Sequence, residues 1–332
     1  MAYTTIDNPE LYFQTKTYSG SSSDVTVTFD GSEDMQPDVV WLKKRGGSGD
    51  HLIYDSVRGV NKRLQPNATD AEVDRSSNND ELKSFNSDGW TLGTFNSNVT
   101  GAGSTNVSWN WKESATAGFD IVSYTGNATN RTISHSLSAV PKMIIVKNRA
   151  DAVEWQIYHQ GIGNDHSIFL DLDNGKDAGS FYWNDTTPTS SVFSVGTYSG
   201  TNGSSDNMIA YCFADIQGFS KFGSYSGNSN ADGPMIFLGF KPAFVIVKLV
   251  SSSGGSWNIF DNKREGYNPD NDALFADVNG AETTTDYLDF LSNGFKIRRN
   301  SSDINSSGET YIYMAFAESP FVNSNGVPNN AK

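Results

Sequence analysis

The stretch Val39-Val40-Trp41-Leu42-Lys43-Lys44-Arg45 reveals the architecture of the chain, because two relatives of it follow further along the sequence. They read Met143-Ile144-Ile145-Val146-Lys147-Asn148-Arg149 and Phe244-Val245-Ile246-Val247-Lys248. Two positions before each run stands a proline, namely Pro37, Pro141 and Pro242. A β-branched and aromatic run of this length, bounded by proline, is typical of a buried strand. We therefore expect the same strand three times.

Other landmarks accompany each of these strands in the same order. A Tyr-x-Gly triplet precedes each one: Tyr18-Ser19-Gly20, Tyr124-Thr125-Gly126 and Tyr225-Ser226-Gly227. An alternating run that ends in an acid closes each unit: Trp109-Asn110-Trp111-Lys112-Glu113, Tyr211-Cys212-Phe213-Ala214-Asp215 and Met314-Ala315-Phe316-Ala317-Glu318. Self-similarity at intervals of roughly 100 residues predicts three tandem units, each long enough to fold alone.

The spacing of strands and turns predicts the fold class and the boundaries. Short strand patterns separated by Gly, Asn and Ser favour an all-β protein of three tandem antiparallel β-sandwich, jelly-roll-like modules. We expect an N-terminal arm (1–14), segment 1 (15–113, with a long polar insertion at 55–84), segment 2 (114–216), segment 3 (217–321) and a polar C-terminal tail (322–332).

Composition argues against several classes of protein. The 332 residues carry a formal net charge of −14, whereas nucleic-acid binding needs a basic surface. No apolar run is long enough to span a membrane, and residues 1–7 have neither the basic start nor the apolar core of a signal peptide. Cys212 is the one cysteine, so no disulfide forms within the chain, and its strand position predicts a small buried side chain.

A metal site has one candidate, in the run Asp171-Leu172-Asp173-Asn174-Gly175-Lys176-Asp177. The alternating oxygen ligands Asp171, Asp173 and Asp177 resemble a calcium loop, but the glycine is one position early and no Glu closes the loop. A polar hairpin turn explains the same letters. We expect the turn, with no cofactor, and keep calcium as the alternative.

Catalytic motifs are missing from the sequence, so we expect a protein that is not an enzyme and has no catalytic residues. There is no Gly-x-Ser-x-Gly elbow, phosphate loop or His-Glu-x-x-His pattern. Asp55, His159 and Asp261 end the second strand of the three units, and we interpret them as a strand-end surface position.

Aromatic residues raise the question of sugar binding. Most tryptophans lie at repeated landmarks and are expected in the core. Trp183, in a predicted strand at 180–183, lies outside the landmarks and is the candidate for an exposed ring that stacks on a ligand.

Several of these stretches are also similar to a known group. The sequence resembles the β-rich, tandem-repeat tail and tail-fibre-like virion proteins of tailed phages of marine bacteria, of the cyanophage and pelagiphage type. The similar stretches are Tyr3-Thr4-Thr5-Ile6-Asp7-Asn8-Pro9, Tyr12-Phe13-Gln14-Thr15-Lys16, Gly31-Ser32-Glu33-Asp34-Met35-Gln36-Pro37-Asp38, the three strands after proline, and the closing runs of segments 2 and 3. The resemblance implies surface parts of the virion that are often trimeric, and it transfers no catalytic residue.

The leading hypothesis is a structural virion protein of the tail or tail fibre, assembled in the host cytoplasm. Its expected partners are other virion proteins, further copies of itself as a homo-oligomer such as a trimer, and a receptor or glycan on the host surface. We expect no nucleic-acid partner and no membrane insertion. Three alternatives stay open: a carbohydrate-binding protein, a head decoration or fibre protein, and a depolymerase with a carboxylate pair.

Overall fold

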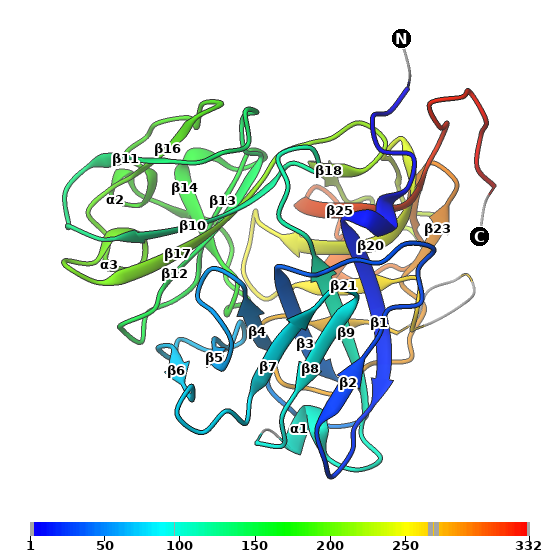
Figure 1. The fold of residues 1–332 in the computed structure, drawn as a ribbon. Coiled ribbons are helices and arrows are strands. Elements are labelled where there is room, and N and C mark those ends of the chain that lie inside the picture. Colours follow the sequence, from blue (N-terminus) through cyan, green and yellow to red (C-terminus); the bar gives the residue numbers. More distant parts are fainter. Residues whose placement is uncertain (1–2, 96, 265–267, 269–271, 331–332) are drawn as a thin grey trace.

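The computed structural model describes residues 3–95, 97–264, 268 and 272–330. Within them the chain consists mostly of β-strands in several antiparallel sheets, with short helices between them. This confirms the predicted all-β class. Figure 1 shows three lobes around a common centre: segment 1 in blue and cyan, segment 2 in green, and segment 3 in yellow to red.

Each segment contributes one larger sheet, and the strand orders correspond. Segment 1 has the order β1 (Phe13–Ser19), β9 (Thr105–Trp111), β3 (Val39–Lys44), β4 (Leu52–Asp55). Segment 2 has β10 (Phe119–Thr125), β17 (Asn207–Phe213), β12 (Met143–Asn148), β13 (Gln156–His159), β14 (Gly163–Phe169), β15 (Asp177–Ala178). Segment 3 has β18 (Ser220–Ser226), β25 (Thr310–Pro320), β20 (Phe240–Leu249), β21 (Asn258–Asp261), β22 (Leu274–Phe275). The strand that carries the repeated run is third in every sheet. In segment 3 it already begins at Phe240, so Pro242 lies within the strand at an irregularity of its pairing, and the predicted start just after proline is wrong there.

Smaller sheets and helices complete the lobes. The small sheets are β2 (Val25–Val27), β8 (Gly89–Leu92), β7 (Leu82–Asn86); β11 (Arg131–Ser134), β16 (Val192–Val195); and β19 (Met235–Phe237), β24 (Gly294–Ile297), β23 (Leu288–Leu291). In the 55–84 insertion β5 (Lys62–Arg63) pairs with β6 (Val73–Asp74). The helices are η1 (Pro9–Leu11), α1 (Ser97–Thr100), α2 (Ser180–Trp183), α3 (Ser199–Asn202) and α4 (Ser302–Asn305).

One face of each larger sheet packs inside its own lobe. In segment 1, Val40 and Leu42 of β3 form an apolar cluster with Trp90 and Leu92 of the small sheet. In segment 2, Ile144 and Val146 of β12 do the same with Phe193 and Val195. The alternation of strand side chains sends every second residue to this outer cluster and the residues between them to the opposite face.

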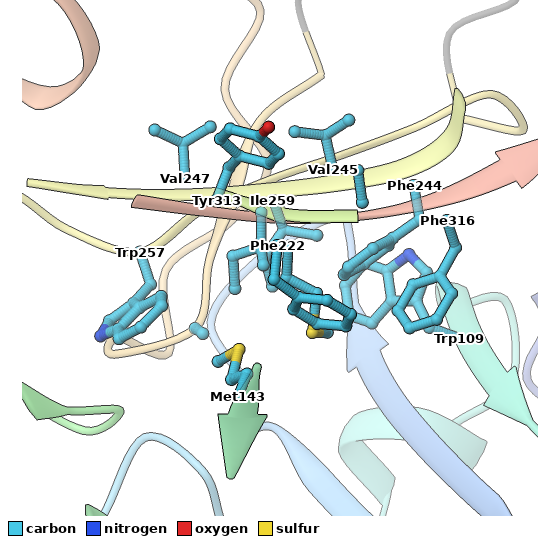
Figure 2. Packing of buried hydrophobic residues seen from close by; sticks show 14 of the residues in the cluster. Trp109, Met143, Phe222, Phe244, Val245, Val247, Trp257, Ile259, Tyr313 and Phe316 are labelled. Carbon is cyan, nitrogen blue, oxygen red and sulfur yellow. The ribbon is translucent and has the colours of Figure 1, made fainter. Parts of the chain in front are cut away.

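The opposite faces of the three larger sheets meet in a common core. It includes Trp41, Trp109 and Trp111 from segment 1, Ile145, Tyr211 and Phe213 from segment 2, and Phe244, Ile246 and Phe316 from segment 3. Figure 2 shows Trp109, Met143, Phe244 and Phe316 on one side of the segment 3 strands, and Val245, Val247 and Tyr313 on the other. An apolar cavity of ≈ 20 Å³, lined by residues of all three segments, lies at the centre. The lobes therefore share a closely packed interior.

The Tyr-x-Gly landmark has a steric cause. A Cβ atom on Gly126 would lie 1.9 Å from the carbonyl oxygen of Gly203, just after α3. Cβ atoms on Gly20 and Gly227 would lie 2.3 and 2.2 Å from backbone oxygens that follow α1 and α4. Only glycine lets the chain pass so close to these helix ends.

The N-terminal arm packs against segment 3. The Thr4 hydroxyl donates to the Gln217 carbonyl over 2.8 Å, and Ile6 is buried in the common core. Asp7 accepts hydrogen bonds from Ser324 of the C-terminal tail. The N-terminal arm and the C-terminal tail accordingly lie on the same side of the molecule, in blue and red in Figure 1. The first sheet begins at Phe13, which lies inside the predicted arm.

Candidate functional site at the contact of segments 2 and 3

The three segments contact one another in a cyclic order through corresponding positions. The ring N–H of Trp155 in segment 2 donates to the Gln65 carbonyl of segment 1 over 3.0 Å. The ring N–H of Trp257 in segment 3 donates to the Phe169 carbonyl of segment 2 over 2.7 Å. In segment 1, His51 stands at this position and its Nε2 lies 2.9 Å from the Phe275 carbonyl of segment 3. Each segment thus reaches the backbone of the one before it in the cycle.

The lysine of the repeated strand is buried at each contact. Lys43 donates to the Gly280 carbonyl of segment 3 over 2.7 Å, and Lys147 donates to the Thr69 carbonyl of segment 1 over 2.9 Å. Lys248 donates to the Gly255 carbonyl within its own segment. Burial disfavours the ammonium form and lowers the pKa of each lysine to about 8. The sequence showed the repeated lysine but not its burial.

Two of the three contacts hold a cluster of arginines and acids whose inner Arg–Asp pair is fully buried. Between segments 1 and 2, Arg58 pairs with Asp55 at 2.5 Å, and Glu72 bridges Arg58 (3.1 Å) to Arg149 (2.8 Å). The Tyr211 hydroxyl of segment 2 also donates to Asp55 over 2.7 Å. The polar 55–84 insertion therefore anchors segment 1 to segment 2.

The contact between segments 3 and 1 repeats this arrangement. Arg264 pairs with Asp261 at 2.6 Å, and Glu282 bridges Arg264 (3.1 Å) to Arg45 (2.8 Å). The indole N–H of Trp109 donates to Asp261, as Tyr211 does to Asp55. Because arginine presents several donors in a fixed plane, one arginine can pair with two carboxylates at once. We name each set an Arg–Glu–Arg cluster: Arg58, Glu72, Arg149 and Arg264, Glu282, Arg45.

The third contact, between segments 2 and 3, lacks this cluster. Backbone bonds identify the corresponding positions: the N–H of Lys176 donates to the Val250 carbonyl as that of Glu72 does to Arg149. The three positions of the cluster are thus occupied by Ile162, Lys176 and Val250. These side chains cannot form the two bridges seen elsewhere.

His159 takes the place of Asp55 and Asp261 at this third contact. Its Nδ1 accepts the N–H of Gly161, so the proton lies on Nε2, which donates to the Tyr313 carbonyl of segment 3 over 3.2 Å. Burial lowers the pKa of His159 to about 4, and the ring is neutral at neutral pH. Asp55, His159 and Asp261 are all fully buried, so the predicted strand-end surface position is wrong. The strands end against the neighbouring segment, not in solvent.

A pocket of ≈ 550 Å³ opens beside the third contact. It is lined by Glu154, Phe169, Leu172, Asn174, Gly175, Lys176, Asp177, Tyr182, Tyr198, Val250, Ser251, Ser252 and Ser253. Lys176 and Val250, which replace members of the Arg–Glu–Arg cluster, belong to this lining. The N–H of Gly254 donates to the Asp173 carbonyl over 3.0 Å and ties the two loops of the pocket together.

Two tyrosine–carboxylate pairs form one wall of the pocket. The Tyr182 hydroxyl of α2 donates to Asp177 over 2.6 Å, and the Tyr198 hydroxyl donates to Glu154 over 2.9 Å. The two rings meet edge to face with centroids 5.1 Å apart. Burial, together with the bond to Glu154, raises the pKa of Tyr198 to about 12, so this phenol stays protonated and donates. Each carboxylate is held in place and keeps acceptor capacity for a ligand.

Trp183, predicted as an exposed ring, is buried with 1% of its surface accessible. Residues 180–183 form the helix α2 and not the predicted strand, and this turn directs Trp183 inward, where it contacts the ring of Tyr158. Phe181, its neighbour in the helix, is 40% exposed instead. The exposed-ring prediction is wrong because a helical turn changes which side chains face solvent.

The calcium candidate gains no support from the geometry. Asp171 is buried and accepts the backbone N–H of Trp155, while Asp177 faces Tyr182 and Asp173 is exposed. Among the described residues no group of three or more His, Cys, Asp or Glu side chains could hold a metal ion. The loop connects the paired strands β14 and β15, as the hairpin interpretation expects. Its side chains line the pocket, which the sequence did not reveal.

A family model for a domain of unknown function, DUF7483, matches residues 8–320. The chain belongs to the DUF7483 family. The match covers all three segments, so the DUF7483 unit includes the whole cyclic arrangement and not a single lobe. A search of curated proteins found no match to this DUF7483 chain. In its described part, no helix has the length and apolar character needed to cross a membrane.

Proposed function

We propose that this DUF7483 protein is a structural component of a phage virion, in the tail or associated with the tail fibre. It assembles in the host cytoplasm with other virion proteins, and it works by binding rather than by catalysis. The proposal rests on the sequence resemblance, which extends over all three segments, and on the character of the contacts between them.

The observation that carries the proposal is the closure of three lobes around one core. Trp109, Phe213 and Phe316, one from each segment, are buried in the same apolar cluster. Two Arg–Glu–Arg clusters and the anchored chain ends add polar contacts that fix the lobes relative to one another. A rigid body that presents many loops outward suits a part that must hold its shape within an assembly.

The matching strand orders further support a tandem repeat of β-sandwich modules with jelly-roll-like character. In this interpretation a larger and a smaller sheet enclose each outer cluster, and the other face of the larger sheet was adapted to join the lobes. The common core makes the modules interdependent, so a single module made alone is expected to expose a large apolar face.

Mass spectrometry of purified particles of the phage that carries the gene tests the proposal. We expect the protein in fixed stoichiometry to known tail proteins. Its presence in infected cells but not in particles would overturn the proposed function.

Light scattering of the purified chain, with and without EDTA, tests the oligomer. We propose a homo-oligomer, in the first place a trimer, whose mass does not change with EDTA. A monomer at all concentrations would contradict this part, and a mass that falls with EDTA would restore the calcium alternative.

A further inference from the structure

We propose that the pocket between segments 2 and 3 binds neutral saccharide units. This deepens the proposed function, because on that function the pocket would give the virion part a site for a neutral glycan of the host surface. Three observations support saccharide binding: the size of the pocket, the oriented carboxylates, and the replacement of the Arg–Glu–Arg cluster at this contact.

The size of the pocket suits a small polar ligand. A volume of ≈ 550 Å³ lies within the range of small-molecule sites and accommodates one or two sugar rings. Serine, asparagine and carboxylate side chains form much of the lining, with Phe169, Leu172 and Val250 as its aliphatic and phenyl part. Sugars combine many hydroxyl groups with a weakly apolar ring face, which matches this composition.

The polar groups are arranged to accept hydroxyl hydrogens. Glu154 and Asp177 each use an oxygen to accept a tyrosine hydroxyl, and both line the pocket with acceptor capacity left over. Hydrogen bonds to ionised acceptors are stronger than those between neutral groups. The half-buried ring of Tyr198 offers an apolar surface beside them.

Charge favours a neutral sugar over an acidic one. Two carboxylates line the pocket, and Lys176 is its one cationic side chain among the lining residues. Lys176 is exposed, so water screens its charge. An acidic sugar would be repelled by Glu154 and Asp177, whereas neutral hydroxyls are attracted to them.

The other two contacts show that the pocket is specific to this one. There the Arg–Glu–Arg clusters occupy the positions of Ile162, Lys176 and Val250. The helix α2, which carries Tyr182, has no counterpart among the described helices of segments 1 and 3. Tyr198 precedes α3, and Ser301 stands at that place before α4 in segment 3.

Saturation-transfer difference NMR on the full chain tests the proposal. The probes are glucose, galactose, mannose and N-acetylglucosamine, with glucuronic acid and sialic acid as acidic comparisons. We expect saturation transfer to at least one neutral sugar at millimolar concentration. Transfer to the acidic sugars alone, or to none of the six, would overturn the proposal and leave the virion assignment untouched, because that assignment is tested on particles.

Matched variants locate the site. Glu154→Gln removes the charge of one acceptor in the wall, and Tyr198→Phe removes the hydroxyl that orients Glu154. We expect an affinity loss of about tenfold for each, which corresponds to about 1.4 kcal/mol of lost interaction. Asp50→Asn changes the corresponding acid of segment 1, which lies outside the pocket and binds Asn67; it should leave binding unchanged.

A blocking variant keeps the test informative if the wall variants fold poorly. Ser252→Trp places a large ring at the pocket lining from a loop, and we expect it to abolish saturation transfer with an unchanged melting temperature. Sugar binding that survives this substitution and both wall variants would place any site elsewhere and overturn the proposal.

Discussion

Trp109 and Asp261 are separated by 152 residues, yet the indole N–H of Trp109 donates to the Asp261 carboxylate over 2.9 Å. Both residues are fully buried, and Asp261 also pairs with Arg264. Tyr211 and Asp55 repeat this relationship across the next contact. The acid at the end of the second strand of a unit therefore joins two lobes at two of the three contacts. At the third contact the neutral His159 stands in place of this acid.

Asp261→Asn should be among the most destabilising polar substitutions in the chain. It leaves the fully buried Arg264 without its closest counter-charge, and Glu282 becomes its remaining acidic partner within the cluster. Breaking a buried pair on one side typically costs about 3–5 kcal/mol. Urea unfolding monitored by tryptophan fluorescence measures the loss.

Asp30→Asn is the matched control for Asp261→Asn. Asp30 is half exposed and pairs with Lys16 and Lys263 at the surface. Exposed pairs contribute about 0–1 kcal/mol. Equal losses of stability in the two variants would contradict the assignment of Asp261 to a buried structural contact.

Gly126→Ala should destabilise the protein by about 1–3 kcal/mol, the usual cost of forcing extra atoms into a packed site. The added Cβ would lie 1.9 Å from the Gly203 oxygen, so the backbone after α3 must move. Gly280→Ala is the comparison, because its Cβ would have no neighbour closer than 3.9 Å. Thermal melts of both variants check the prediction, which is wrong if the two melt alike.

The three buried lysines should make stability depend on pH in the alkaline range. Their pKa is about 8 in the folded protein and about 10.4 in an unfolded chain. Between these values the unfolded state binds more protons, so the free energy of unfolding rises with pH. Equivalently, stability is lost as the pH falls from about 10 to about 8.

Lysine variants separate this contribution from those of other groups. Lys147→Met should flatten the rise in unfolding free energy between about pH 8 and 10, because one titrating group is lost. Lys296→Met, at a partly exposed surface pair with Asp232, should leave the slope unchanged. The quantity to compare is the slope of the unfolding free energy against pH. Identical slopes in the wild type and in Lys147→Met would show that Lys147 keeps an ordinary pKa.

Glu113→Gln should stabilise the protein at pH 8 but not at pH 4. Burial, with Asp120 and Asp38 nearby, raises the pKa of Glu113 to about 7. Because the folded pKa is above the unfolded pKa of about 4.3, the protonated Glu113 contributes stability below about pH 4.3. That contribution is lost as the pH rises through 7. Glutamine stays neutral and can still accept the Ile121 N–H that Glu113 binds. Urea midpoints at the two pH values test this, and a variant less stable at pH 8 refutes it.

The strands of the fold could be predicted because their signals are local. The repeated strands β3, β12 and β20 are runs of β-branched and aromatic residues, and they are buried along nearly their whole length, as expected from these runs. Pro37 and Pro141 stand just before β3 and β12, whereas Pro242 lies inside β20. The Tyr-x-Gly triplets recur because the chain passes a helix end where no Cβ fits. Cys212 was likewise expected to be buried, and it is.

The site could not be predicted in the same way. Trp183 was expected in solvent, but a four-residue helix buries it, and helices that short leave little pattern in a sequence. The loop from Asp171 to Asp177 resembles a calcium loop in sequence, whereas its place in the pocket lining depends on Ser251–Ser253 in another segment. The exchange of Arg, Glu and Arg for Ile162, Lys176 and Val250 is visible in the sequence only after the structure shows which positions correspond.

The all-β class and the three repeated buried strands followed from the sequence, since runs of β-branched and aromatic residues bounded by turn residues are local signals. Tertiary structure alone decided that Trp109 would meet Asp261 and that Asp55, His159 and Asp261 would be buried. It also decided that one of three related contacts would leave a pocket. Those outcomes depend on how three lobes pack around a shared core, where burial and pairing are set by residues more than a hundred positions away.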